Sequence, residues 1–458
     1  MSDRGAPPAR LGDSDHRLLL VGLVCLVTLV ATEAMAISTV MPSVEDDLGD
    51  LWLYGWVFSA FYLGNLVGVV VGGRAVDRVA PVGPMAVGVS VFLGGLVVGG
   101  LAPSMSVLVA GRLLQGVGAG VVPAVSYVCV GRGFPEMLRP KVFAVMSTAW
   151  VVPSLVSPLL ASFVADHFGW RWVFLGLVPV TVVVSALAVP ALRAVAPAPV
   201  GERARSEATA VRSVLLLVLG SGLLVGGLSL DRPAVGVPVA VLGLLVLLPA
   251  FRELTPPGTL RAGRGLAATV LSRGLLTWAF FSADAFVSLA MTSVRSASTR
   301  DAGFVLAGSS LMWTAGSWLQ ARTYTDWGPS RLVRIGALSV LTGCAVMVVC
   351  LAPAVPLWTW LAAGALTGFG MGIAYAPMST LTLALAEPGE QGAATSALQM
   401  TDILGIALGT GIAGVVVTVG ERATARPWPP LAAVFMLAAG IAGSVAVLST
   451  RLTAAQSS

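Results

Sequence analysis

Residues 18–41 read LLLVGLVCLVTLVATEAMAISTVM, an apolar run whose one charged side chain is Glu33. A helix needs about 20 such residues to cross a hydrocarbon core about 30 Å thick. Arg17 precedes the run and residues 34–36 read AMA, as at a signal-peptidase site, but the run is long for a signal peptide and many similar runs follow. We therefore expect an uncleaved first transmembrane helix.

The rest of the chain repeats this composition. Of its 458 residues, 56% are hydrophobic and 11% are charged, with a mean hydropathy of +0.90, whereas about a quarter of the residues in soluble domains are charged. Only helices or a closed barrel satisfy all backbone groups in lipid, and these runs are continuous rather than alternating. We predict an all-α, polytopic membrane protein.

The apolar runs place the expected helices. A reading with twelve helices would make 213–229 and 234–251 a single re-entrant element, because only residues 230–233 separate them. Our prediction has fourteen transmembrane helices, near residues 18–41, 53–76, 84–102, 105–130, 141–165, 172–193, 213–229, 234–251, 265–292, 301–321, 331–353, 355–385, 391–419 and 428–451.

Basic residues fix the expected orientation. With the N-terminus inside, one of the 27 basic residues, Arg112, lies within a span, and six lie in outer loops: Arg171, Arg232, Arg295, Arg300, Arg422 and Arg426. The other twenty are then cytoplasmic, so the positive-inside rule predicts an inner (plasma) membrane protein with both termini in the cytoplasm. The net charge of +5 reflects this inner arginine belt and does not indicate nucleic-acid binding.

Landmarks recur at an offset of about 250 residues, as expected for a duplicated transporter. Residues 32–35 (TEAM) return as 283–286 (ADAF), residues 116–120 (GVGAG) return as 368–372 (GFGMG), and the loop at Asp77 returns at Asp326. We predict two pseudo-symmetric six-helix bundles, 18–193 and 265–451, between tails 1–17 and 452–458. Residues 194–264 then form a linker with an inserted helix pair.

Three segments carry a resemblance to a known family. Residues 73–81 read GRAVDRVAP, residues 112–118 read RLLQGVG, and residues 150–158 read WVVPSLVSP. They resemble the G-x-L-a-D-r-x-G-r-k loop, the R-x-x-Q-G-x-G motif and the antiporter motif ending in Gly-Pro-x-x-Gly-Gly of the major facilitator superfamily. With GWRWVF at 169–174 and the inserted pair, the chain after its N-terminal tail resembles the fourteen-helix drug:proton antiporter branch.

The resemblance has gaps. Ala80 and Pro81 stand where the family has glycine and a basic residue, while Ser157 and Ala161 replace glycines of the antiporter motif. These departures weaken the expectation of drug specificity and leave the superfamily resemblance intact.

The resemblance implies a conformational gate at Gly73, Asp77, Arg78, Pro153 and Pro158. We expect Gly73 to permit close helix approach and Asp77 to accept hydrogen bonds from a facing helix N-terminus. The alternatives are a solvated charge pair in the loop and prolines that only kink the helix.

Few charges lie well inside the expected spans: Glu33, Asp284, Asp402 and Arg112. Each costs about 2.5–3.5 kcal/mol to insert, so together they cost on the order of 10 kcal/mol unless they pair or contact water. Glu33 and Arg112 both lie about 10–12 Å from the outer ends of their helices, so we predict an ion pair between them. Such a pair serves coupling or, alternatively, helix packing alone.

Asp284 is the predicted main proton carrier. It is the repeat counterpart of Glu33, but Gly364 stands where the first half has Arg112. Arg273 is eleven residues away, about 16 Å of helix rise. Desolvation without a counter-charge favours the neutral carboxyl. Asp402 is the next candidate.

The expected substrate cavity is built from polar and aromatic side chains. Asp402 follows Gln399 at helical spacing, and Gly405 and Gly409 continue that face, which we expect to line the cavity. Aromatic rings there provide stacking surfaces for a planar or cationic substrate. The predicted lining residues are Gln115, Trp150, Trp278, Phe281, Trp313 and Gln399.

These features predict a proton-coupled secondary transporter that exports a small amphipathic drug or metabolite by alternating access. The alternative is an importer of a small nutrient, because the same fold runs in both directions. No phosphate-binding loop is present and Lys141 is the only lysine, which argues against direct use of ATP. An enzyme would need clustered His, Cys or carboxylate groups near an interface, and a channel or sensor would lack the repeat. We expect no cofactor or metal, a monomer, and the substrate, protons and lipid as partners.

Overall fold

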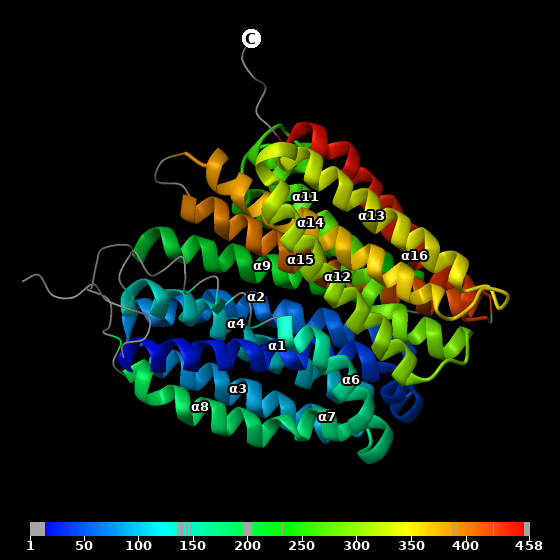
Figure 1. Cartoon of the computed structure of the whole chain (residues 1–458), viewed down its shortest axis with the longest axis horizontal. Helices are drawn as coiled ribbons and strands as arrows, with labels where there is room; N and C mark the ends of the chain where they lie inside the picture. Colours follow the sequence, from blue (N-terminus) through cyan, green and yellow to red (C-terminus); the bar gives the residue numbers. More distant parts are fainter. Residues whose placement is uncertain are drawn as a thin grey trace, which may run out of the picture.

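The structure is a computed structural model that describes residues 14–134, 151–193, 204–230, 232–387, 391–424 and 426–452, together with 142, 145, 146, 149 and 195. At 14–16, 77, 131, 151, 154, 155, 204–210, 391 and 392 the backbone alone is described. Within these residues every regular element is a helix, and the long helices lie side by side (Figure 1). Fourteen of them have 17 residues or more. The predicted all-α membrane fold is confirmed.

The helices fall into two halves and an inserted pair. The N-terminal half contains α1 (Ser14–Leu48), α2 (Tyr54–Arg78), α3 (Val82–Gly100), α4 (Met105–Gly133), α6 (Val151–Phe168), α7 (Arg171–Leu175) and α8 (Leu177–Arg193). The inserted pair is α9 (Ala204–Ser229) and α10 (Pro233–Leu254). The C-terminal half contains α11 (Leu266–Leu289), continued by a π-helical turn (Ala290–Val294), α12 (Thr299–Trp327), α13 (Pro329–Cys350), α14 (Thr359–Leu385), α15 (Gln391–Thr424) and α16 (Trp428–Leu448).

Twelve of the fourteen long helices are long and apolar enough, by length and composition, to span a membrane. The other two are α6 and α12, which lie where we expected spans at 141–165 and 301–321. Much of the expected span before α6 lies outside the described residues. α12 is rich in Ser and Thr and carries Arg322 and Asp326, so its composition is less apolar than that of its neighbours.

Glycines bring helices of each half into close contact. A Cβ added to Gly68 of α2 would lie 2.0 Å from the backbone oxygen of Val117 in α4, and one added to Gly368 of α14 would lie 1.9 Å from that of Ser309 in α12. Gly64 and Gly72 of α2 also pack on α4. Small residues four apart permit this approach.

The close approach predicted for Gly73 does not occur with any residue that the structure describes. A Cβ added there would meet none of their atoms within 4 Å. Gly73 lies one position beyond the row of Gly64, Gly68 and Gly72, and a step of one residue turns a helix by about 100°. Gly73 therefore points away from α4.

The two halves meet chiefly along two seams, α2 against α15 and α6 against α12. At the first, a Cβ added to Gly414 would lie 2.6 Å from the Cα of Gly55, and Ser59 Oγ donates to the Ala407 carbonyl at 2.7 Å. At the second, a Cβ added to Gly303 would lie 3.2 Å from the Pro158 carbonyl oxygen.

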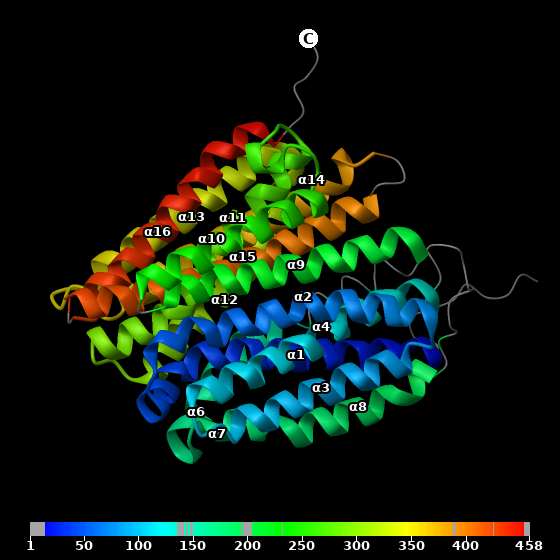
Figure 2. The same cartoon turned by 180° about the vertical axis from the view of Figure 1, so that it is seen from behind.

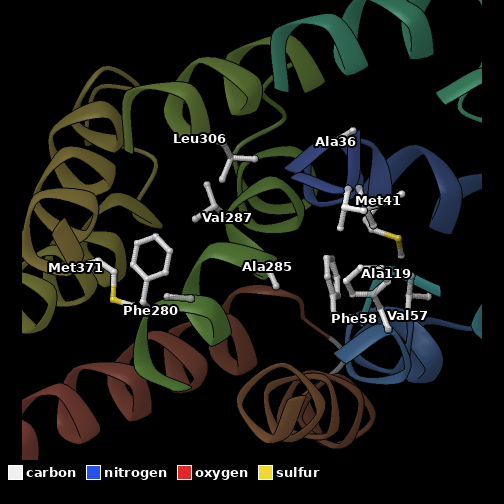
Figure 3. Packing of buried hydrophobic residues seen from close by; sticks show 14 of the residues in the cluster. Ala36, Met41, Val57, Phe58, Ala119, Phe280, Ala285, Val287, Leu306 and Met371 are labelled. Carbon is white, nitrogen blue, oxygen red and sulfur yellow. The ribbon is translucent and has the colours of Figure 1, made fainter. Parts of the chain in front are cut away.

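These contacts lie near the start of α2, the start of α12 and the second half of α15, away from the end of the bundle where α1 begins. The helices of the C-terminal half slant toward the N-terminal half at the end where α6 and α12 meet (Figure 1). Figure 3 shows Val57 and Phe58 of α2 on one side of this junction and Ala285, Val287 and Leu306 of α11 and α12 on the other. The halves are thus joined at one end of the bundle.

The inserted pair forms two separate helices rather than one re-entrant element. Glycines hold α9 and α10 together, because a Cβ added to Gly227 would lie 2.4 Å from the Ala240 nitrogen. α9 contacts both α2 and α15 and lies along their seam (Figure 2). There Leu217 of α9 packs in one cluster with Leu66 of α2 and Leu404 of α15.

Candidate transport site

The structure forms the predicted pair between Glu33 of α1 and Arg112 of α4. Arg112 Nη1 donates to Glu33 Oε1, and the two side chains are only 2% and 1% exposed, respectively. Gln115 Nε2 donates to the same Glu33 oxygen at 3.2 Å. Arg112 Nε donates to the Val57 carbonyl of α2 at 3.2 Å. The pair therefore joins α1, α2 and α4.

Gln115 is fully enclosed, so it supports the ion pair instead of lining an open cavity. The Arg112 guanidinium also lies over the Phe61 ring, 4.3 Å from its centroid. A buried charge needs this many partners because it has lost its water.

A second buried pair lies in the C-terminal half, and sequence reasoning missed its arginine. Arg273 of α11 is buried, so Arg112 is not the only basic residue inside a span as expected. Arg273 Nε donates to Asp402 Oδ1 of α15 at 2.9 Å. Tyr375 of α14 donates its hydroxyl to Asp402 Oδ2 at 2.7 Å. Three helices again meet at one arginine.

The Arg273 side chain is held from several sides. Its Nη1 donates to the Tyr375 carbonyl at 2.7 Å and to Ser379 Oγ at 3.3 Å. The guanidinium carbon lies 3.0 Å from the centroid of the Tyr375 ring. Because ionisable residues in membrane spans commonly pair with one another, Asp402 was the signal that pointed to a second buried arginine.

The two glycines of the α15 face that we expected to line a cavity pack against α11 instead. A Cβ added to Gly405 would lie 2.2 Å from the Gly274 carbonyl oxygen, and one added to Gly409 would lie 2.8 Å from that of Trp278. Gly-x-x-x-Gly spacing favours helix contact, which accounts for the error. Gln399 is exposed.

Aromatic rings connect the two ion pairs across the halves. Phe61 contacts Tyr62 (centroids 5.3 Å apart), Tyr62 contacts Phe281 of α11 (6.3 Å), and Phe281 contacts Trp313 of α12 (6.4 Å). Trp313 then contacts Tyr375 at 5.6 Å. We call Phe61, Tyr62, Phe281, Trp313 and Tyr375 the aromatic row. Two residues predicted for the cavity, Phe281 and Trp313, belong to it.

Of the other two predicted aromatic residues, one lies among the described residues. Trp278 is buried against α15, and Trp150 lies outside the described residues.

Asp284 lies beside the aromatic row. It is half-buried, and it makes no ion pair or hydrogen bond with any residue that the structure describes. The Tyr62 hydroxyl is within coulombic range of Asp284, Glu33, Arg112 and Asp402. The unpaired acid therefore lies near both networks. Two surface hollows of about 530 Å³ each, at the start of α13 and the end of α10, lie away from these groups.

This fold and these motifs are matched in known proteins. Residues 23–348, more than half of the chain, match the Major Facilitator Superfamily. The chain belongs to that superfamily. It is therefore a multi-pass membrane transporter, and the predicted family is confirmed.

Relatives within the superfamily include drug-efflux proteins. A probable multidrug-efflux transporter of Mycobacterium tuberculosis is 29% identical over 421 residues, which cover 87% of this chain and 88% of the relative. A multidrug efflux pump of Staphylococcus aureus is 23% identical over 172 residues, 38% of each chain. These relatives are transporters, not enzymes.

Solved structures share the fold over nearly the whole chain. An auto inhibited POT family peptide transporter gives a TM-score of 0.72 at 16% identity and covers 96% of this chain and 98% of that chain. A D-xylose-proton symporter gives 0.65 at 14% identity and covers 94% and 97%. Identities this low establish the common fold alone.

The gate residues implied by the superfamily motifs differ in burial, and one of their side chains lies outside the described residues. Arg78 is the exposed last residue of α2, and the Asp77 side chain lies outside the described residues. Pro153 and Pro158 are buried in α6. Pro158 lies on the seam with α12, at Gly303, so it is placed where the two halves contact each other.

Proposed function

We propose that this superfamily member exports small amphipathic molecules in exchange for protons by alternating access, with Asp284 as the proton carrier. The relatives named for multidrug efflux support the substrate class. The observation that carries the proposal is the Asp284 carboxylate, which has no partner among the described residues, whereas Glu33 and Asp402 each pair with an arginine. Of these three acids, the unpaired Asp284 gains and loses a proton at the lowest cost, because no arginine holds it ionised.

The same proposal assigns an orientation. Most basic residues lie in segments that would be cytoplasmic if both termini are inside, which supports an inner-membrane protein of that topology. The contacts of Gly55 with Gly414 and of Pro158 with Gly303 then lie toward the outer side. On this assignment the structure corresponds to a state closed to the outside.

Proton and substrate would compete for one uncompensated charge. Within each arginine–carboxylate pair the two charges cancel. Ionised Asp284 therefore leaves this region with one net negative charge. A proton removes that charge without breaking either pair. Whether the transporter reopens to the other side would then depend on whether the proton or the substrate is bound.

Transport in proteoliposomes tests the proposal. With ethidium as the probe and an imposed pH gradient, the wild-type protein should accumulate dye in the compartment that is acidic. Asp284→Asn should retain ethidium binding and exchange but lose dependence on the gradient. Glu33→Gln is the comparison, because it should lower binding or stability, and whatever transport remains should still depend on the pH gradient. If Asp284→Asn still concentrates ethidium with unchanged pH dependence, Asp284 is not the carrier and Asp402 becomes the candidate.

The direction of transport separates the proposal from the importer alternative. In inside-out membrane vesicles that are acidified internally, an exporter takes up dye from the medium. An importer of the symporter type would concentrate its substrate in right-side-out vesicles under an inward proton gradient.

A further inference from the structure

The two buried arginine–carboxylate pairs differ in how far they are enclosed. In the N-terminal pair, Glu33 is 1% exposed and Gln115 is fully buried. In the C-terminal pair, the Asp402 side chain is 12% exposed. The nearby Trp313 and Tyr375 are only half-buried. Solvent therefore reaches the C-terminal pair, whereas the N-terminal pair is enclosed.

Arg273 keeps an unused donor on this accessible side. Its Nε donates to Asp402 and its Nη1 to Tyr375 and Ser379. Its Nη2 donates to no residue that the structure describes, and it is not among the enclosed polar atoms that lack a partner. Asp402 thus engages one N–H of a guanidinium that is able to hold a carboxylate through two parallel bonds.

The surroundings of Arg273 suit a ring that carries an acid. The Tyr375 ring lies against the guanidinium, and Trp313 contacts Tyr375 at 5.6 Å. A planar ligand stacked on Trp313 would bring a carboxylate substituent toward Nη2. Aromatic faces and a few placed polar groups are the usual components of a small-molecule site.

We propose that Arg273 binds a carboxylate of aromatic substrates, with Asp402 as its counter-ion when the site is empty. This proposal rests on the proposed transport function. Asp402 and the ligand then compete for the same guanidinium. Neutralising Asp402 strengthens the binding of an aromatic carboxylate, whereas removing the Arg273 charge weakens it. A structural ion pair would show no such opposite effects.

A matched pair of dyes tests the inference. Rhodamine 110 carries a free carboxylate, and rhodamine 123 is its methyl ester with the same ring system. Fluorescence polarisation with the purified full chain gives the Kd of each dye. Asp402→Asn should tighten rhodamine 110 binding. The charge-neutral variant Arg273→Gln/Asp402→Asn should weaken it by about tenfold or more, the loss expected for a charge-assisted hydrogen bond, and should leave rhodamine 123 within about threefold.

Two further variants serve as controls for the charge at residue 273 and for the loss of an arginine elsewhere. Arg273→Lys keeps the positive charge but loses the planar pair of N–H donors. Its affinity for rhodamine 110 should therefore be intermediate between those of the wild type and the double variant. Arg334, near the start of α13, is exposed and donates to Ser449 Oγ. Arg334→Gln should leave the Kd values of both dyes unchanged. Retained rhodamine 123 binding reports that each variant is folded.

Three results would overturn the inference: no rhodamine 110 binding to the wild type, equal losses for both dyes, or weaker rhodamine 110 binding in Asp402→Asn. Each differs from failure of the proposed function. If the inference fails while rhodamine 123 is still driven by a pH gradient, proton-coupled transport stands without a carboxylate site.

Discussion

Closure of the α2–α15 seam depends on two glycines whose backbones touch. A Cβ added to Gly414 would lie 2.6 Å from the Cα of Gly55, where ordinary contact begins at 3.4 Å. Gly414→Ala therefore creates an overlap of about 0.8 Å between two backbones that cannot rotate away. Relief requires α2 and α15 to separate, so the substitution should penalise the seam-closed state selectively.

Overpacking of this kind costs about 1–3 kcal/mol, and an equilibrium shifted by that amount changes about 5- to 150-fold. Thr410, which is 1% exposed and lies 3.2 Å from Ser59 across the seam, reports the opening. In a chain without native cysteines, Thr410→Cys should react slowly with an impermeant maleimide applied outside. In the Gly414→Ala background the labelling rate should rise by up to that factor.

Gly440→Ala is the matched control, because a Cβ at Gly440 of α16 would meet no atom of the described part of the chain within 4 Å. It should leave the labelling rate of Thr410→Cys unchanged. An unchanged rate in Gly414→Ala, or an equal rise in Gly440→Ala, would refute the reasoning that this contact holds the seam closed. Equal thermal unfolding midpoints for both variants would exclude general loss of folding as the cause.

The remaining predictions concern the N-terminal ion pair, the inserted helices and the loop after α2. Removing either Glu33 or Arg112 alone leaves a buried charge and should destabilise the protein by about 3–5 kcal/mol in thermal unfolding; exchanging both residues should recover part of the transport, and no recovery would count against a direct role for the pair. A cysteine in place of Asp231, between α9 and α10, should react with an impermeant reagent from outside, and labelling from the cytoplasm alone would contradict two spanning helices. Asp77→Asn should abolish transport while ethidium binding persists, and joint loss of binding and folding would point to a structural residue.

The sequence was sufficient to place helices along the chain, because a hydrocarbon core requires runs of a fixed length. The ends were less predictable. α1 was expected at 18–41 but continues to Leu48, through Glu45 and Asp47. Charged residues end an apolar run, but they do not end a helix once it has reached the interface, where side chains are hydrated.

At the site, the depth of a residue along its helix was more predictable than the neighbour that its side chain faces. Glu33 and Arg112 were predictable partners because residue counting gives depth directly. Arg273 was missed because it lies only eight residues inside the expected span 265–292, where an arginine usually extends to the interface. Its pairing with Asp402 depends on the angles at which α11 and α15 face each other, which a single sequence does not specify.

The difference in enclosure between the two pairs constrains which group carries the proton. A proton on Glu33 would neutralise the counter-charge of Arg112, which is 2% exposed, and losing one partner of a buried pair costs about 3–5 kcal/mol. Loading Asp402 would weaken the Arg273 and Tyr375 contacts that join α11, α14 and α15. Loading Asp284 breaks no contact with a described residue. On the proposed mechanism, a proton at Asp284 therefore changes the charge of the site without dismantling the packing of either half, so charge and helix packing can be altered independently during the cycle.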